Sequence, residues 1–311
     1  MRVLFLLLLF FFTQINFAQI LSEKDRATLK DELLEDRFQN LLPQLMDDAN
    51  LDMWLLISRE YNEDPVLKTM LPSTWLNARR RTIIVFYKNK EKQTIERLAV
   101  ARYDIGKSIK SAWNKEKEPN QWKALSDIIA ERNPEKIGVN YSKHFPLADG
   151  LVKTDYEELT QNLPDSLTSK LVSAEKLAVA WVETRTEKEI QLFEKLVKIT
   201  HDIIYEAFSN KVITPGETTT DDVVWWMRQK VTDLGLETWF HPTVNIQRNK
   251  EALKSHIESF SKSKEDKAIQ KGDLLHCDFG ITYIGLNTDC QQHAYVLKDD
   301  EVKVPTYIAN A

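Results

Sequence analysis

Residues 272–296 read GDLLHCDFGITYIGLNTDCQQHAYV, and this stretch decides the fold of the second half of the chain. Apolar residues on both sides of a Tyr-Ile-Gly sequence predict two β-strands joined by a tight turn. Asp278 and Asp289 lie in the two arms of this hairpin. A two-residue turn at Tyr283 and Ile284 predicts that the two acids stand directly opposite each other on one face, with Cβ atoms roughly 4.5–5.5 Å apart.

Two carboxylates at this separation repel each other, and the protein can relieve the repulsion in three ways. One acid can stay protonated, both can point into water, or a cation can lie between them. The apolar strands indicate a buried hairpin, in which full solvation of both acids is unfavourable. A hard divalent cation bound by carboxylate oxygens removes the repulsion and creates a Lewis acid. The spacing alone leaves both a metal site and a hairpin with solvated acids open.

Length and composition restrict the classes of protein to which the chain can belong. Its 311 residues are enough for two domains of ordinary size. Hydrophobic residues make up 42% of the chain and charged residues 29%, which is typical of a globular protein with a sizeable core. The net charge of −5 and the absence of a block rich in Lys and Arg argue against nucleic acid as the main partner.

Residues 1–18 predict a secretory signal peptide. Arg2 gives a positive start, ten apolar residues run from Val3 to Phe12, and a more polar stretch leads to Ala18. The alternative, a membrane anchor, needs roughly 18–20 apolar residues, which is more than this run provides. We therefore expect export to the periplasm or the extracellular space, with no membrane association after cleavage.

The rest of the chain predicts two domains. Strands and helices alternate over 20–175, which favours an α/β or α+β domain. We expect a boundary near 162–166, a strand-like connector over 177–182 and a long amphipathic helix over 186–208. Further elements are expected in both domains: strands over 52–58, 81–87, 95–103, 136–140 and 243–246, and helices over 25–45, 121–131, 154–162 and from 218 to 235.

The hairpin resembles a known motif. Gly272–Gly280 followed by Asn287-Thr288-Asp289 is similar to the first metal-ligand motif of the pita-bread metallopeptidases, which include Xaa-Pro aminopeptidases, prolidases, methionine aminopeptidases and creatinase. Glu183–Ile190 resembles the start of that family's catalytic domain, and Ser58–Pro65 resembles its amino-terminal domain. The resemblance implies a creatinase-type N-terminal domain over 20–175, followed by the first half of a pita-bread domain over 181–311.

The resemblance also implies roles for single residues. In that family two hairpin aspartates, a later histidine and two later glutamates hold a pair of divalent ions, which generate a hydroxide and polarise the scissile carbonyl. Asp278 would be a ligand to one ion and Asp289 would bridge both, with Mn, Co or Zn as the metal. His256 is the candidate for a histidine that contacts the substrate or the tetrahedral intermediate. A surface position is the alternative for His256, and His241 is the rival candidate.

Two further pairs lie close to the aspartates. His276 shares the strand face of Asp278 and could contact the metal, although a hydrogen-bonded histidine is the more common case; His293 is a weaker candidate of the same kind. Under the predicted register Cys277 and Cys290 oppose each other on the reverse face. A cross-strand disulfide is one reading, and two buried small hydrophobic residues are the reading that we favour.

The family's later ligands would follow Ala311, which is 22 residues beyond Asp289. We therefore expect a chain truncated at its C-terminus and inactive by itself. The predicted parent function is an exported hydrolase of Xaa-Pro aminopeptidase type, which cleaves near the N-terminus of a peptide substrate with two divalent ions. The alternatives are a non-catalytic peptide-binding relative or fragment of this fold, and an unrelated exported α/β binding protein. The resemblance leaves a homodimer open.

Overall fold

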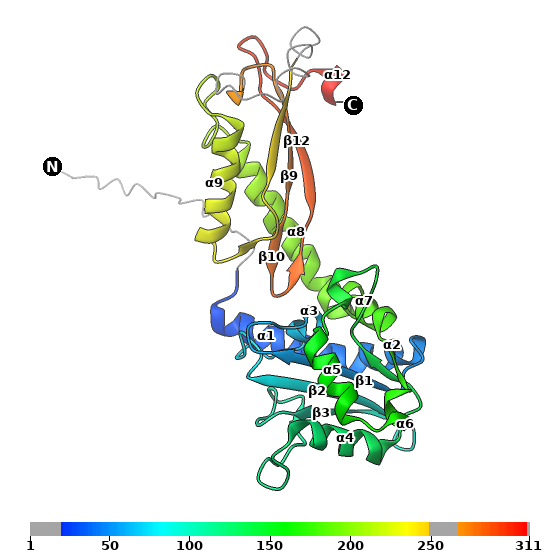
Figure 1. The fold of residues 1–311 in the computed structure, drawn as a ribbon. Helices are drawn as coiled ribbons and strands as arrows, with labels where there is room; N and C mark the ends of the chain where they lie inside the picture. The colour runs from blue at the N-terminus through cyan, green and yellow to red at the C-terminus, as the bar shows by residue number, and fades with distance from the viewer. Residues whose placement is uncertain (1–19, 249–266, 310–311) are drawn as a thin grey trace, which may run out of the picture. The chain divides into compact units, whose positions relative to one another are not determined.

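The structure is a computed structural model that describes residues 20–248 and 267–309. The chain divides into two units (Figure 1). The N-terminal unit is Ser22–Gln191, and the C-terminal unit is Leu192–Ala311 together with the residues up to Leu21. The predicted signal peptide, residues 1–18, lies outside the described residues. Among the residues that the structure describes, no helix is both long and apolar enough to cross a membrane.

The N-terminal unit is built on a six-stranded mixed sheet with the order β4-β3-β2-β1-β5-β6. The pairs β1–β2 and β2–β3 are antiparallel. The pairs β1–β5, β5–β6 and β3–β4 are parallel. The strands are β1 (Met53–Arg59), β2 (Arg81–Asn89), β3 (Thr94–Val100), β4 (Lys110–Ser111), β5 (Ile137–Val139) and β6 (Leu171–Ser173).

β1 is apolar along nearly its whole length because both faces of this sheet are covered. Met53, Leu55 and Ile57 enter one apolar cluster, and Trp54 and Leu56 enter another on the opposite face. The first of these clusters also holds side chains of α4 and α5, and the second holds side chains of α1, η1, α2, α3 and α7. The helices of the unit are α1 (Glu23–Asp36), the π-helical turn η1 (Arg37–Leu41), α2 (Leu42–Asp48), α3 (Pro65–Thr69), α4 (Gln121–Arg132), the 3₁₀ turn η2 (Pro146–Ala148), α5 (Lys153–Asn162), α6 (Asp165–Thr168) and α7 (Glu175–Glu183).

The strand-like connector predicted over 177–182 is wrong, because this segment is helix α7. Leu177, Ala178 and Trp181 are buried in the core of the N-terminal unit. Their spacing fits one face of a helix, but a short apolar run cannot be assigned from periodicity alone. The unit continues to Gln191, past position 181 at which the sequence predicts the catalytic domain to begin.

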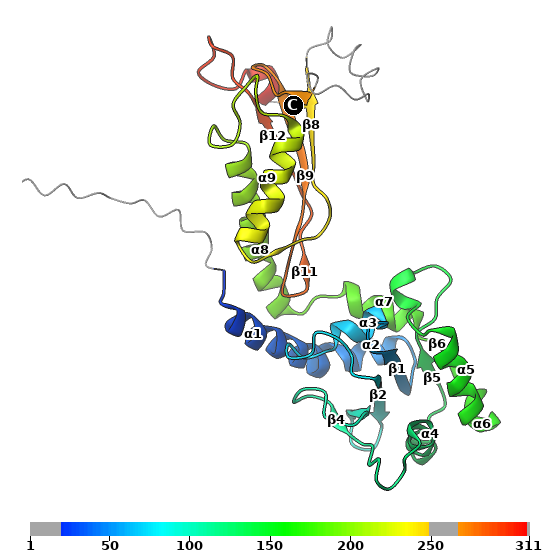
Figure 2. The same ribbon diagram turned by 60° about the vertical axis from the view of Figure 1, so that its left-hand side comes forward.

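The C-terminal unit packs helices against one face of a small antiparallel sheet with the order β12-β9-β8. Figure 2 shows α8 and α9 on the same side of these strands. A second sheet has the order β11-β10-β7. The elements are α8 (Glu187–Ala207, which begins in the N-terminal unit), α9 (Thr220–Asp233), β7 (Glu237–Thr238), β8 (Thr243–Gln247), β9 (Leu274–Phe279), β10 (Ile281–Tyr283), β11 (Leu286–Asn287), β12 (Cys290–Tyr295) and α12 (Thr306–Ala309).

Local sequence explains where α9 begins and ends. Thr219 is its N-cap, and Thr219 and Asp222 hydrogen-bond to each other's backbone N–H groups in a capping box. Gly235 follows the helix with a φ of 65°, a left-handed conformation that glycine adopts without steric penalty. The helix predicted from 218 to 235 is therefore present with the expected cap, and it holds one side of the sheet that carries the hairpin.

Candidate metal site on the hairpin

The hairpin turn lies one residue later than the sequence analysis predicted. Tyr283 pairs with Leu286, so Ile284 and Gly285 are the two central turn residues. Their φ angles are 53° and 79°, the left-handed pair that a two-residue hairpin loop requires. A turn at Tyr283 and Ile284 would have put two bulky residues in that conformation, whereas the observed turn uses the flexibility of Gly285.

This register changes the partner of Asp278 but not the face on which it lies. Asp278 is opposite Gln291, and Asp289 lies two residues before Gln291 on the same arm. The predicted direct opposition of the two acids is therefore wrong, and they are diagonal neighbours instead. Because strand residues alternate between faces with a period of two, a shift of the partner by two residues keeps both acids on one side.

The backbone at the junction of β9 and β10 brings the two arms close together. Thr288 is buried, its Oγ1 lies 2.8 Å from Thr200 Oγ1 on α8, and it accepts a hydrogen bond of 3.1 Å from the N–H of Ile281. A Cβ atom on Gly280 would lie 2.1 Å from the carbonyl oxygen of Thr288, so only glycine fits there. These contacts fix the backbone immediately before Asp289.

Asp278 forms no ion pair with a Lys or Arg side chain of the described residues 20–248 and 267–309. The pKa of Asp278 is raised above its ordinary value of 3.8, mainly by burial and then by the charge of Asp289 and a hydrogen bond with it. The charge of His276 acts in the opposite direction but does not outweigh these effects. Oδ1 of Asp278 is buried and accepts no hydrogen bond in the described part of the chain. A buried carboxylate oxygen with no donor, beside a second carboxylate, fits the requirements of a divalent cation.

The described residues supply these two carboxylates but no larger ligand set. Within 20–248 and 267–309 no group of three or more His, Cys, Asp or Glu side chains is placed so that it could hold a metal ion. His256 falls within 249–266 and so lies outside the described residues. The ring centroid of His241, the rival candidate, lies 5.6 Å from that of Trp225.

The two cysteines are free thiols. In the observed register Cys277 is opposite Gln292, and Cys290 is opposite Phe279. The prediction that the two cysteines oppose each other is therefore wrong, because the turn lies one residue later than predicted. Cys277 is fully buried in the core with α8 and α9, and burial raises the pKa of its thiol to about 11. This is the behaviour of a small hydrophobic residue, the interpretation that we favoured.

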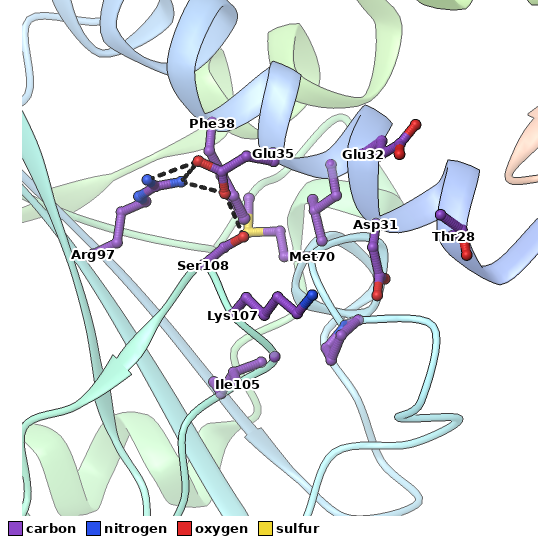
Figure 3. A pocket seen from close by; sticks show the side chains of 13 residues that line it. Thr28, Asp31, Glu32, Glu35, Phe38, Met70, Arg97, Ile105, Lys107 and Ser108 are labelled. Carbon is purple, nitrogen blue, oxygen red and sulfur yellow. Dashed lines mark hydrogen bonds and ion pairs between the residues drawn. The ribbon is translucent and has the colours of Figure 1, made fainter.

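A separate cavity of about 440 Å³ lies in the N-terminal unit (Figure 3). Arg97 donates hydrogen bonds of 2.9 Å to both carboxylate oxygens of Glu35, and Ser108 donates a further one. Asp31 accepts hydrogen bonds from the N–H and the hydroxyl of Ser73. Glu35 and Asp31 thus have hydrogen-bond donors within the cavity region, and none of the predicted site residues lines the cavity.

Comparison with known proteins adds the family. Residues 191–307 match the model of Metallopeptidase family M24. This segment therefore resembles metallopeptidase family M24. No curated protein matched in the corresponding sequence search.

Solved structures similar to this chain share its fold at low sequence identity. An X-Pro aminopeptidase from Thermotoga maritima has a TM-score of 0.56 at 14% identity, over 83% of this chain and 66% of that one. A putative aminopeptidase P from Bacillus anthracis has a TM-score of 0.56 at 12% identity, over 86% and 65%. A zinc-substituted aminopeptidase P from E. coli, in complex with product, has a TM-score of 0.52 at 11% identity, over 90% and 63%.

These likenesses confirm the predicted fold, a creatinase-type N-terminal domain followed by part of a pita-bread domain. The chain spans just under two thirds of the length of these solved chains, at 66%, 65% and 63%. The matched segment includes the whole hairpin with Asp278 and Asp289. The assignment of these two residues as metal ligands stays a prediction.

Proposed function

We propose that this chain is part of an exported metallopeptidase of Xaa-Pro aminopeptidase type, whose hairpin supplies two carboxylates to a site for two divalent ions. The observation that carries the proposal is the buried Oδ1 of Asp278, which has no hydrogen-bond donor among the described residues and belongs to a side chain beside Asp289. The M24 relation and the solved aminopeptidases of the same fold support peptide hydrolysis as the reaction.

The two aspartates would have different tasks. Asp278 lies within β9, whose pairing with β8 and β12 fixes the backbone of the carboxylate that would hold one ion. Asp289 follows the buried Thr288, whose contacts with α8 and β10 fix the distance between the arms. When bound, the divalent ions supply a Lewis acid for the scissile carbonyl and lower the pKa of a bound water.

Two carboxylates hold a divalent ion weakly, since structural and catalytic sites for such ions take several more ligands. We therefore propose that this polypeptide binds an ion but hydrolyses no peptide alone, and that further donors complete the site. Mn²⁺, Co²⁺ and Zn²⁺ all accept carboxylate ligands, so their availability selects the metal.

Binding of Mn²⁺ to the full chain, measured by titration calorimetry, tests the proposal. We expect Asp278→Asn and Asp289→Asn each to weaken binding at least tenfold, because either change halves the charge that faces the ion. Asp300→Asn, which removes a carboxylate from an exposed turn, is the matched control and should leave binding unchanged. Equal Mn²⁺ binding by the wild type and both hairpin variants would show that the acids are structural and would end the metallopeptidase assignment.

A further inference from the structure

The polar face of the C-terminal sheet carries more metal-binding chemistry than the two aspartates. Val244, Leu275 and Cys277 belong to the core that this sheet shares with α8 and α9. The alternate residues therefore lie on the other face, where β9 places His276 and Asp278. The face that carries His276 and Asp278 points away from α8 and α9 and is lined by polar side chains.

His276 and His293 are directly opposite each other on β9 and β12. Their ring centroids are 4.8 Å apart, and the ring planes are inclined at 46°. His293 is exposed and His276 is half-buried, so an ion in water can reach both rings. Opposed residues on antiparallel strands keep their Cβ atoms about 5 Å apart, which allows two imidazoles to share one ion.

A hydrogen bond holds the ring of His276. Its Nε2 lies 2.9 Å from Oε1 of Gln291, the residue opposite Asp278. When Nε2–H donates to that oxygen, Nδ1 carries the free lone pair that a metal needs. Partners of this kind orient ligand histidines in known metal sites. Asp278, two residues away on the same face, adds a negative charge that favours a cation.

We propose that His276 and His293 form a two-imidazole binding site for a first-row transition ion of the Cu²⁺, Ni²⁺ or Zn²⁺ class. Imidazole nitrogen binds these ions in preference to Mg²⁺ or Ca²⁺, and the affinity rises toward Cu²⁺. Water supplies the remaining ligands. The site does not rest on the proposed peptidase function, because its donors are the two imidazoles and not the carboxylates of Asp278 and Asp289.

Electron paramagnetic resonance of the full chain with one equivalent of Cu²⁺ tests the site, because it detects coordinated nitrogen directly. We expect a spectrum with two imidazole nitrogens in the wild type. The pair of changes His276→Asn and His293→Asn should remove this spectrum and weaken Ni²⁺ binding at least tenfold. His144→Asn, which removes an exposed imidazole from the N-terminal unit, is the matched control and should change neither readout. Circular dichroism checks that each variant is folded.

A second pair of changes separates this site from the proposed peptidase site. Asp278→Asn with Asp289→Asn should abolish Mn²⁺ binding and leave the two-nitrogen Cu²⁺ spectrum intact. A two-nitrogen spectrum that survives loss of both histidines overturns the two-imidazole site, as does its loss when only the aspartates are changed. Mn²⁺ binding that persists without the aspartates instead overturns the peptidase proposal and leaves the histidine site standing.

Discussion

Both units bring like charges together on adjacent strands, but the chain neutralises only one of the two pairs itself. Arg59 and Arg81 are directly opposite each other on β1 and β2, and the fully buried Asp155 lies 3.2 Å and 3.4 Å from their Nε atoms. Asp278 and Asp289 are diagonal neighbours in the hairpin, and in the described part of the chain no Lys or Arg forms an ion pair with either.

The difference shows how one electrostatic problem yields either structure or a binding site. A counter-charge supplied by the chain, such as Asp155, is always present and fixes the strands and α5 in one arrangement. Two acids without an internal counter-charge repel each other, and a cation from solution would relieve this repulsion. The unpaired acids are therefore more informative about function than the arginine pair, although the pair contains more buried charge.

The largest effect is expected from removing the internal counter-charge. Asp155→Asn removes the anion that Arg59 and Arg81 share and leaves only Glu158, 2.8 Å from Arg81, so we expect a loss of about 2 kcal/mol in the free energy of unfolding of the N-terminal unit. Breaking a fully buried pair costs roughly 3–5 kcal/mol, and this loss is smaller because Arg59 is 41% exposed and can turn toward water. Hydrogen exchange of the β1 and β2 amides under increasing urea measures this unit alone.

The control for that experiment is the exposed pair Lys123–Asp127, whose side chains are 56% and 61% exposed. Asp127→Asn should cost at most about 0.5 kcal/mol, since exposed pairs on helices contribute little. An equal cost for the two substitutions would mean that Asp155 is not the shared counter-charge of the two arginines.

The position of the acids depends on the register of the hairpin, which the turn sets. Gly285 has a φ of 79°, and a Cβ atom there would meet nothing within 4 Å. Gly285→Ala should therefore cost about 1 kcal/mol by backbone strain alone. Gly285→Asn should cost less, because asparagine tolerates the left-handed region. Exchange of the β9 and β12 amides is the readout, and no loss for either variant would contradict the turn at Ile284 and Gly285.

The sequence predicted the faces of the hairpin better than its register. Faces follow from a period of two, so Asp278 and Asp289 lie on one side whether the turn is at 283–284 or at 284–285. The register depends instead on which residues tolerate positive φ, and Gly285 was the signal for it. The helix α7 was missed because a short apolar run cannot be assigned to a strand or a helix from periodicity alone.

Contacts between distant residues left no signal in the sequence. Arg59 and Asp155 are 96 positions apart, and only the packing of α5 beside β1 and β2 brings them together. The opposition of His276 and His293 was likewise hidden, because it depends on the corrected register. Motif reasoning found the acids of the candidate site, whereas their strand partners, and the lack of an ion pair within the described residues, required the structure.

The hairpin acids should destabilise the metal-free protein, unlike the arginine pair with its own anion. Without metal, Asp289→Asn should raise the free energy of unfolding of the C-terminal unit by about 0.5 kcal/mol, because a like-charge contact is lost. Mn²⁺ at 100 times its Kd should stabilise the wild type by about 2.7 kcal/mol and reverse the order of the two proteins. Urea unfolding with and without Mn²⁺ measures both. A variant that is less stable under both conditions would indicate that Asp289 has a purely structural role.

The smallest expected effect is a difference in pH dependence between two carboxylates. Glu35 of the N-terminal unit is paired with Arg97, whereas Asp278 has no such cation among the described residues. Burial raises the pKa of Glu35, but hydrogen bonds from Arg97, Ser108 and Gln39 outweigh it and hold the pKa below 4.5. Glu35 therefore stabilises the fold above that pH, and its contribution is lost on acidification. Glu35→Gln should lower the stability of its unit near neutral pH, and the difference from the wild type should shrink as the pH falls.

Asp278 should behave in the opposite way in metal-free protein. Its pKa is raised above 3.8, so the folded state binds the proton more tightly than the unfolded chain does, and stability falls as the pH rises above that value. Asp278→Asn should therefore raise the stability of the C-terminal unit near neutral pH, by an amount that shrinks on acidification. Unfolding of both variants in urea between roughly pH 3 and pH 7 spans these carboxyl titrations. Differences of the same sign for Glu35→Gln and Asp278→Asn would show that Asp278 already has a counter-charge within the protein, which would remove the reason to expect an ion there.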